Sequence, residues 1–299
     1  EAQVADLERK VKTVSIKKIK EAIKGKEVPN FFEYAYKRME IIKSTVSYST
    51  YKAYYAAIVK FEKWVGTRDV YFDDFSVTLL NDYKNYLSKE LKNGLTTQRL
   101  SIIVLGTIFN QAIKEEIIPE TMFPFKKLTL KTDNTKRLFL NKDKILDLTQ
   151  LKLIEGKKAN LWRDLFLFSI YAGGLRFSDV IEMQYKHYNK NEQRISKLIR
   201  KTGRPHQFKI GKVAIDILEK YCKEGADNED YIFPVIEDKK GYEKSESLRY
   251  FYTAKYNKLA NWHLKKLGEK MELPFKLSFH LSRHTFATNA LNNGMRIEH

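Results

Sequence analysis

The chain has 299 residues, enough for two domains of ordinary size, and its 43% hydrophobic content excludes wholesale disorder. It carries 55 Lys and Arg against 37 Asp and Glu, a formal net charge of +18, and both halves of the chain share the excess. A folded body this basic usually faces a polyanion, so nucleic acid is favoured as a partner over a membrane surface or an uncomplexed Lys-rich surface.

The composition also limits the compartment and the chemistry. No run of 18 apolar residues predicts a membrane span, and the polar opening EAQVADLERK is unlike a signal peptide. A single cysteine, Cys222, cannot form an internal disulfide or a Cys₂His₂ zinc site, which favours a reducing cytoplasm and no metal. The P-loop, H-E-x-x-H and G-x-S-x-G motifs are absent from the sequence.

In the first half, apolar residues recur at helical spacing. Residues 1–27 predict one amphipathic helix that ends before Pro29, and residues 28–125 predict an all-α unit of four helices. Ser49 or Thr50 is expected to cap the second helix of that unit, and Thr96 or Thr97 the fourth. Residues 126–137, polar and basic without apolar periodicity, predict a linker.

The second half, residues 138–299, predicts a mostly helical domain with one small antiparallel sheet. A hairpin is expected from strands 194–200 and 206–210, joined by the turn Thr202-Gly203-Arg204-Pro205. Helices are expected at 141–155, 161–172, 176–184, 211–223, 245–267 and 280–293.

The segment His280-Leu281-Ser282-Arg283-His284-Thr285 stands at the start of the last predicted helix. His280 and Arg283 are three residues apart and therefore share a helical face. An arginine and a histidine at a helix N-terminus, where backbone N–H groups also point, suit a bound phosphate. The alternative is a capping and packing pair inside an ordinary helix.

A second arginine, Arg176, follows Gly173-Gly174 at an elbow between two apolar helices. A guanidinium close to a core needs an anion or a carboxylate. Asp179, three residues later, is the carboxylate that would make Arg176 purely structural.

These two segments carry a family resemblance. G-G-L-R-F-S-D-V, followed about a hundred residues later by H-L-S-R-H-T-F-A-T-N-A-L, resembles the tyrosine recombinase (phage-type integrase) family. D-L-F-L-F-S-I-Y-A-G-G-L-R-F-S-D is most similar to integrases of Bacteroidetes conjugative transposons and related mobile elements. The turn Lys201-Thr202-Gly203 matches the lysine-bearing β-turn of the family, although Lys197, Arg200 and Lys209 lie nearby.

The resemblance implies a tyrosine recombinase fold. Residues 28–125 would be the SAM-like core-binding domain, 126–137 the linker and 138–299 the catalytic domain. Residues 1–27 would be the linker helix that follows a missing arm-binding domain.

The resemblance also implies a reaction, the cutting and rejoining of DNA through a 3′-phosphotyrosyl intermediate, without metal or nucleotide cofactor. Arg176 and Arg283 would neutralise the phosphate and Lys201 would protonate the leaving 5′-oxygen. His280 would accept the tyrosine proton or hold the phosphate, and His284 would orient the helix.

The family nucleophile is a tyrosine that follows an L-G-H segment beyond the H-x-x-R box. No tyrosine follows Tyr256, and His299 comes too early to be the second His or Trp of the family. The expectation is a catalytic domain that is incomplete at its C-terminus, with the nucleophile outside the printed sequence and the printed chain inactive. The alternatives are a non-catalytic DNA-binding module and a topoisomerase resembling type IB.

The implied partner is double-stranded DNA at attachment sites. The family works as a tetramer on DNA, so a monomer that assembles on DNA is expected, with accessory DNA-bending proteins as further partners and a location on the bacterial nucleoid. The candidate DNA-binding residues are the basic side chains Lys52, Arg99, Lys126, Lys127, Lys131 and Arg137.

Overall fold

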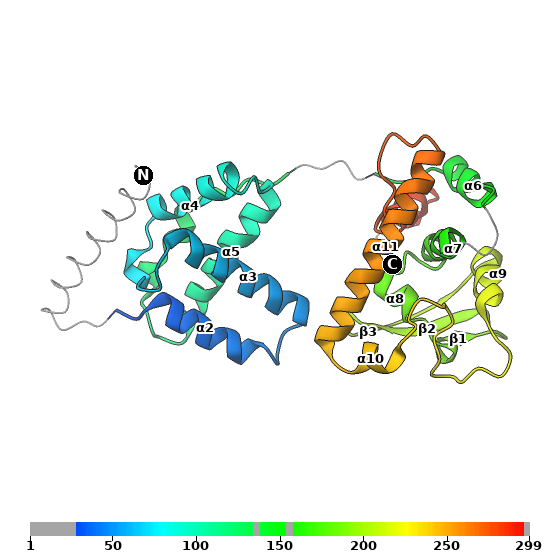
Figure 1. Ribbon diagram of the computed structural model, residues 1–299, viewed down its shortest axis with the longest axis horizontal. Coiled ribbons are helices and arrows are strands. Elements are labelled where there is room, and N and C mark those ends of the chain that lie inside the picture. The colour runs from blue at the N-terminus through cyan, green and yellow to red at the C-terminus, as the bar shows by residue number, and fades with distance from the viewer. Residues whose placement is uncertain (1–27, 134–137, 154–157, 296–299) are drawn as a thin grey trace, which may run out of the picture. The chain divides into compact units, whose positions relative to one another are not determined.

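The computed structural model describes residues 28–133, 138–153 and 158–295 (Figure 1). The chain divides into two compact units, Glu1–Thr135 and Lys136–His299. The predicted helix at 1–27 and the candidate Arg137 lie outside the described residues. Among the described helices, none is long and apolar enough to cross a membrane.

Residues 28–133 of the first unit contain four α-helices, and the side chains that precede three of them explain where they begin. The helices are α2 (Phe31–Ile42), α3 (Tyr48–Val65), α4 (Val77–Lys89) and α5 (Leu95–Lys114). The side chains of Asn30, Ser47 and Ser76 each accept a backbone N–H in the first turn of α2, α3 and α4.

Two predicted caps were wrong. The cap of α3 is Ser47, not Ser49 or Thr50, because the helix begins two residues earlier than the apolar spacing indicated. The cap of α5 is Gly94, so Thr96 and Thr97 lie inside its first turn.

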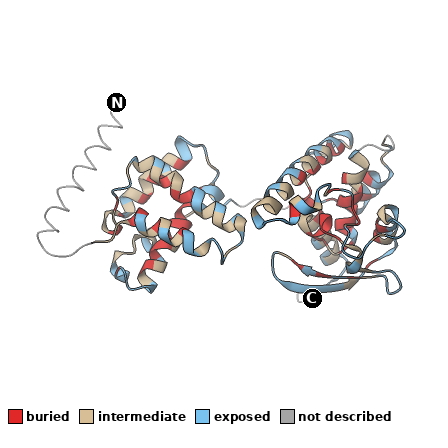
Figure 2. Cartoon of the chain, turned by 60° about the horizontal axis from the view of Figure 1, so that its bottom comes forward, coloured by how far each residue is buried: buried red, intermediate tan, exposed pale blue. Residues whose placement is uncertain are grey.

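Aromatic rings fill the core of the first unit, whose buried residues are coloured red in Figure 2. Phe31 meets Phe61 and Phe72 edge to face, with ring centroids 6.0 and 5.5 Å apart, and Phe72 meets Phe109 at 4.8 Å. Such pairs stabilise a core beyond the burial of their area. The short 3₁₀ turns η1 (Phe72–Asp74), η2 (Glu120–Met122) and η3 (Pro124–Lys127) complete the unit.

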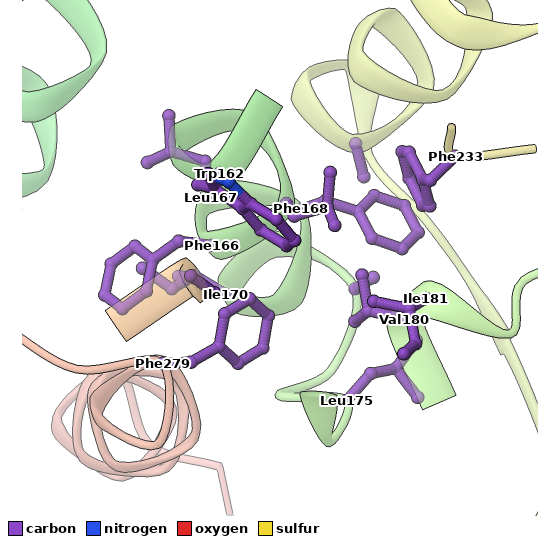
Figure 3. Close-up of a cluster of buried hydrophobic side chains, with 14 of the residues drawn as sticks. Trp162, Phe166, Leu167, Phe168, Ile170, Leu175, Val180, Ile181, Phe233 and Phe279 are labelled. Carbon is purple, nitrogen blue, oxygen red and sulfur yellow. The ribbon is translucent and has the colours of Figure 1, made fainter. Parts of the chain in front are cut away.

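The second unit surrounds one strongly apolar helix. Its elements in chain order are α6 (Lys142–Gln150), α7 (Lys158–Tyr171), α8 (Phe177–Ile181), η4 (Tyr185–His187), β1 (Tyr188–Asn189), β2 (Arg194–Ile199), β3 (Arg204–Lys209), α9 (Lys212–Tyr221), α10 (Lys239–Glu243), α11 (Glu246–Lys270) and α12 (Leu281–Asn292). Helix α7 is the centre of the core: Trp162, Phe166 and Phe168 project from it on several sides, toward Phe279 and Phe233 among others (Figure 3). A mainly helical chain with a small antiparallel sheet is confirmed.

The three strands pair antiparallel in the order β1-β2-β3. The connection of the hairpin is Arg200–Gly203, because Ile199 pairs with Arg204. The predicted turn was therefore shifted by two residues. Gly203, with φ of +63°, supplies the left-handed position, while Pro205 belongs to the edge strand β3, where a missing N–H is tolerated.

Candidate functional site

The elbow between α7 and α8 holds Arg176 in place through two glycines. Gly173 and Gly174 both have a positive φ, +73° and +67°. A Cβ on Gly174 would lie 2.9 Å from Cδ1 of Phe286 on α12, so the elbow also needs glycine for close approach. Arg176 follows as the N-cap of α8.

Buried hydroxyl groups join the start of α12 to this elbow. Ser282 lies fully buried with its Oγ 2.7 Å from Oγ of Ser169 on α7, and the Ser169 hydroxyl also donates to the Leu175 carbonyl at 2.7 Å. Arg283 donates from Nη1 to the carbonyl of Gly174. His280 is the N-cap of α12. Two segments more than a hundred residues apart are therefore held side by side.

Among the basic residues of the hairpin, Lys201 is the one that reaches the cavity beside the two arginines. It stands in the Arg200–Gly203 connection. Lys197 is buried and donates to the Glu182 carbonyl at 2.9 Å, and burial lowers its pKa. Arg200 forms ion pairs with Glu182 and Glu246, and Lys209 lies exposed at the far end of β3.

The four side chains that the sequence predicts to be catalytic line one cavity of about 330 Å³. Arg176, Lys201, His280 and Arg283 all line it, and no carboxylate of the described residues does. The other lining residues are Phe177, Ser178, Thr253, Asn257, Asn261, Ser278 and Phe279. A cavity with four basic groups and polar amides favours an anion.

Burial and the positive charges around the cavity lower the pKa values of two of its residues. Burial lowers the pKa of His280, and the neighbouring His284, Arg283, Lys201 and Arg176 lower it further. The pKa of Arg283 is also lowered, by burial first and by Arg176 second. Burial and the neighbouring positive charges therefore favour the neutral form of His280, which can accept a proton, and Asp179 offsets only part of the charge of the arginines.

A structural pairing with Asp179 does not account for Arg176. Asp179 is buried and forms no side-chain hydrogen bond or ion pair with Arg176; burial raises its pKa, and Lys197 and the backbone of Arg200 oppose that rise. Arg176 forms no ion pair with any carboxylate of the described residues. His284 does not line the cavity; its ring stands edge-on to that of His280 with centroids 4.7 Å apart.

Sequence reasoning missed the polar row of α11. Thr253, Asn257 and Asn261 are spaced four apart and form one wall of the cavity. Asn261 accepts the N–H of Phe279 at 2.7 Å, directly before His280. The four-residue spacing of amides on a long helix was the available signal. Within the described ranges, no three His, Cys, Asp or Glu side chains are grouped to hold a metal ion.

Both units of the chain match known protein families. Residues 30–129 match the phage integrase SAM-like domain, and residues 138–299, more than half of the chain, match the phage integrase family. The chain belongs to the phage integrase family. It is 25% identical over 230 residues to tyrosine recombinase XerA of Pyrococcus horikoshii, covering 76% of this chain and 72% of that protein.

Solved integrases share the fold. The Tn1549 transposon integrase in complex with circular intermediate DNA is 18% identical and covers 90% of this chain and 89% of its own, with a TM-score of 0.66. A lambda integrase tetramer bound to a Holliday junction is 15% identical, covers 89% of this chain and 74% of its own, and gives a TM-score of 0.60. The tyrosine recombinase fold expected from the sequence is confirmed.

The DNA-binding candidates of this integrase differ in their surroundings. Lys52, Arg99, Lys127 and Lys131 are exposed in the first unit. Lys126 is also exposed but pairs with Glu120, Nζ to Oε1 at 2.5 Å. None of these five lines the cavity of the second unit.

Proposed function

We propose that this integrase is a site-specific DNA recombinase that integrates and excises a mobile element. The observation that carries the proposal is the cavity lined by Arg176, Lys201, His280 and Arg283, to which the described part of the chain contributes no carboxylate. Its volume of about 330 Å³ leaves room for a phosphodiester and its flanking sugars. Family membership supports the class of enzyme.

In the proposed reaction a tyrosine oxygen attacks the scissile phosphorus and the bond from phosphorus to the 5′-oxygen breaks. His280, in its neutral form, accepts the tyrosine proton or binds the phosphate, and the Lys201 ammonium gives a proton to the departing 5′-oxygen. Arg176 and Arg283 neutralise the charge that grows on the non-bridging oxygens. Attack of a second 5′-hydroxyl reverses these steps and rejoins the strands, so the reaction needs neither metal nor nucleotide.

Double-stranded DNA at an attachment site is the proposed substrate. The net charge of +18 supports it, as do the DNA-bound states named for the Tn1549 and lambda integrases. The first unit, 28–125, would bind DNA as the core-binding domain, 126–137 would link the units, and 138–299 would cut. Four copies would assemble on two duplexes, with accessory DNA-bending proteins as further candidates.

The test uses the protein expressed from its complete gene, since no tyrosine lines the cavity among the described residues. The protein is incubated with a nicked duplex that carries the element's junction, so that the cleaved strand diffuses away and the covalent complex accumulates. A denaturant-resistant protein–DNA complex is expected. Arg176→Ala and Arg283→Ala should each slow its formation about 10²–10³-fold.

Arg194→Ala is the matched control, because Arg194 lies on β2 outside the cavity and pairs with Glu192. It should form the complex at the wild-type rate. Binding without any covalent complex would instead identify a non-catalytic DNA-binding module. Relaxation of supercoiled DNA that lacks the junction would identify a topoisomerase.

A further inference from the structure

A buried carboxylate lies behind the cavity, outside its lining. The side chain of Glu182 is 10% exposed and ends the helix α8 as its C-cap. Its Oε1 accepts from Nη1 of Arg200 at 3.0 Å and from the hydroxyl of Tyr242 at 2.5 Å. Nε of Arg249 on α11 lies 3.9 Å from the same oxygen. One carboxylate oxygen therefore joins the hairpin connection, α10 and α11 to α8.

Glu182 connects the two segments that carry Arg176 and Lys201. Helix α8 has only five residues, with Arg176 at its beginning and Glu182 at its end. Arg200, the partner of Glu182, directly precedes Lys201. The ion pair therefore ties the backbone that carries the lysine to the helix that carries the first arginine.

Besides the Glu182 ion pair, a backbone hydrogen bond from Arg200 to Asp179 holds the hairpin connection to α8, but neither contact involves the Lys201 side chain. Lys201 is exposed and forms no hydrogen bond or ion pair with the described residues. Thr202 and Gly203 donate backbone N–H groups to the Ile199 carbonyl, at 3.1 and 2.8 Å, which closes the turn on itself but not on the cavity. The side chain of Arg200, next to Lys201, adds ion pairs with Glu182 and the more exposed Glu246 that fix this turn against the rest of the unit.

We propose that Glu182 is a positioning residue for Lys201: by holding Arg200, it aims the lysine ammonium at the leaving 5′-oxygen. A buried acid suits this task, because in a partly dry site its bond to a guanidinium is strong and removal of one partner leaves the other buried and unpaired. Tyr242, fully buried, fixes the carboxylate from the other side and also contacts Thr253, a lining residue of the cavity. The inference rests on the proposed function, which gives Lys201 its role as proton donor.

The test compares two leaving groups in the nicked substrate, using the full-length protein. One substrate has oxygen and the other has sulfur at the bridging 5′ position. A thiolate leaves without a proton, so the sulfur substrate removes the need for Lys201. Glu182→Gln should slow cleavage of the oxygen substrate about 10- to 100-fold, the effect of a small misplacement of a reacting group. Cleavage of the sulfur substrate should stay within about threefold of wild type.

Arg200→Gln breaks the ion pair with Glu182 from a half-exposed position, and it should slow only the oxygen substrate in the same way. If Glu182→Gln does not fold, Arg200→Gln alone tests whether this ion pair positions Lys201. Glu192→Gln is the matched control, an exposed acid that pairs with Arg194 near the other end of β2. It should cleave both substrates at the wild-type rate.

The outcomes separate the two claims. Equal slowing of both substrates by Glu182→Gln or Arg200→Gln, or no slowing of either, would overturn the positioning role while leaving the recombinase intact. A wild-type protein that cleaves neither substrate would overturn the proposed function itself.

Discussion

Arg283 donates a hydrogen bond to the carbonyl of Gly174, so the second arginine of the cavity holds the backbone elbow on which the first is mounted. The elbow, in turn, leaves no room for a side chain at Gly174, because Phe286 of the same helix α12 packs against it. The geometry of the two guanidinium groups therefore depends on one glycine and one carbonyl.

Gly174→Ala tests this dependence. The new Cβ meets Cδ1 of Phe286 at 2.9 Å and the residue keeps a φ of +67°, so both clash and backbone strain oppose it. The free energy of unfolding should fall by about 2–4 kcal/mol. Urea denaturation followed by circular dichroism measures the change.

Gly225→Ala is the control for backbone strain alone, because Gly225 has a φ of +71° and an added Cβ would find no other atom within 4 Å among the described residues. Its loss should be about 1 kcal/mol. Equal losses in the two variants would show that the contact with Phe286 does not restrict the elbow.

The buried pair Ser169 and Ser282 should behave as one unit. Their hydroxyl oxygens lie 2.7 Å apart, and each also lies 2.7 Å from a carbonyl oxygen, of Leu175 and Phe279; the two hydroxyl protons are shared among these three contacts. Ser282→Ala should lower the free energy of unfolding by about 1–3 kcal/mol, since partners remain buried and unsatisfied. The double variant Ser169→Ala/Ser282→Ala should lose less than the two single losses together. Strict additivity in urea denaturation would contradict a direct interaction.

Local signals were enough to predict much of this fold. Glycine pairs, helix caps and apolar spacing act within a few residues, so the elbow before Arg176 and the helix that begins after His280 were found from the sequence. The five-residue helix α10 and the two-residue strand β1 were missed, because elements this short have no periodicity to detect.

The sequence predicted only part of the candidate site, because the contacts that position its side chains are not local. Which basic residue of the hairpin faces the cavity depends on strand register, and the register shifted the turn so that Lys201 lies in the connection. The anchor of Arg200 is Glu182, 18 residues earlier, and the amide that holds the loop before His280 comes from Asn261 on another helix. Such contacts arise from tertiary packing and leave no local trace.

His187 predicts a loss of stability in mild acid. Burial, with Lys197 and Lys186 nearby, lowers the pKa of His187 to about 4 from its ordinary 6.5, and its Nδ1 accepts the N–H of Gln184 at 3.0 Å. Below pH 6.5 the unfolded chain therefore binds a proton that the folded protein resists. The free energy of unfolding should fall as the pH drops from about 7 to about 5, with about 1–2 kcal/mol of the fall assigned to this residue.

His187→Asn keeps an acceptor but cannot titrate, so it should remove that part of the pH dependence. Parallel stability curves for wild type and His187→Asn between about pH 7 and pH 5 would refute the assignment.

The salt dependence of DNA binding should distinguish basic residues by their existing partners. Arg99 is exposed on α5, whereas Lys126 is already paired with Glu120. A phosphate contact releases a counterion, so Arg99→Gln should reduce the slope of log K against log salt by about 0.9. Lys126→Gln should reduce the slope by less than about 0.5, because its carboxylate partner must first be displaced. Anisotropy titrations of a labelled duplex between about 50 and 200 mM salt measure these slopes.

Lys190→Gln is the control. It also removes one positive charge, at a lysine that is paired with Glu219, and it should leave the slope unchanged. Equal reductions in all three variants would mean that net charge alone, rather than placed phosphate contacts, governs binding.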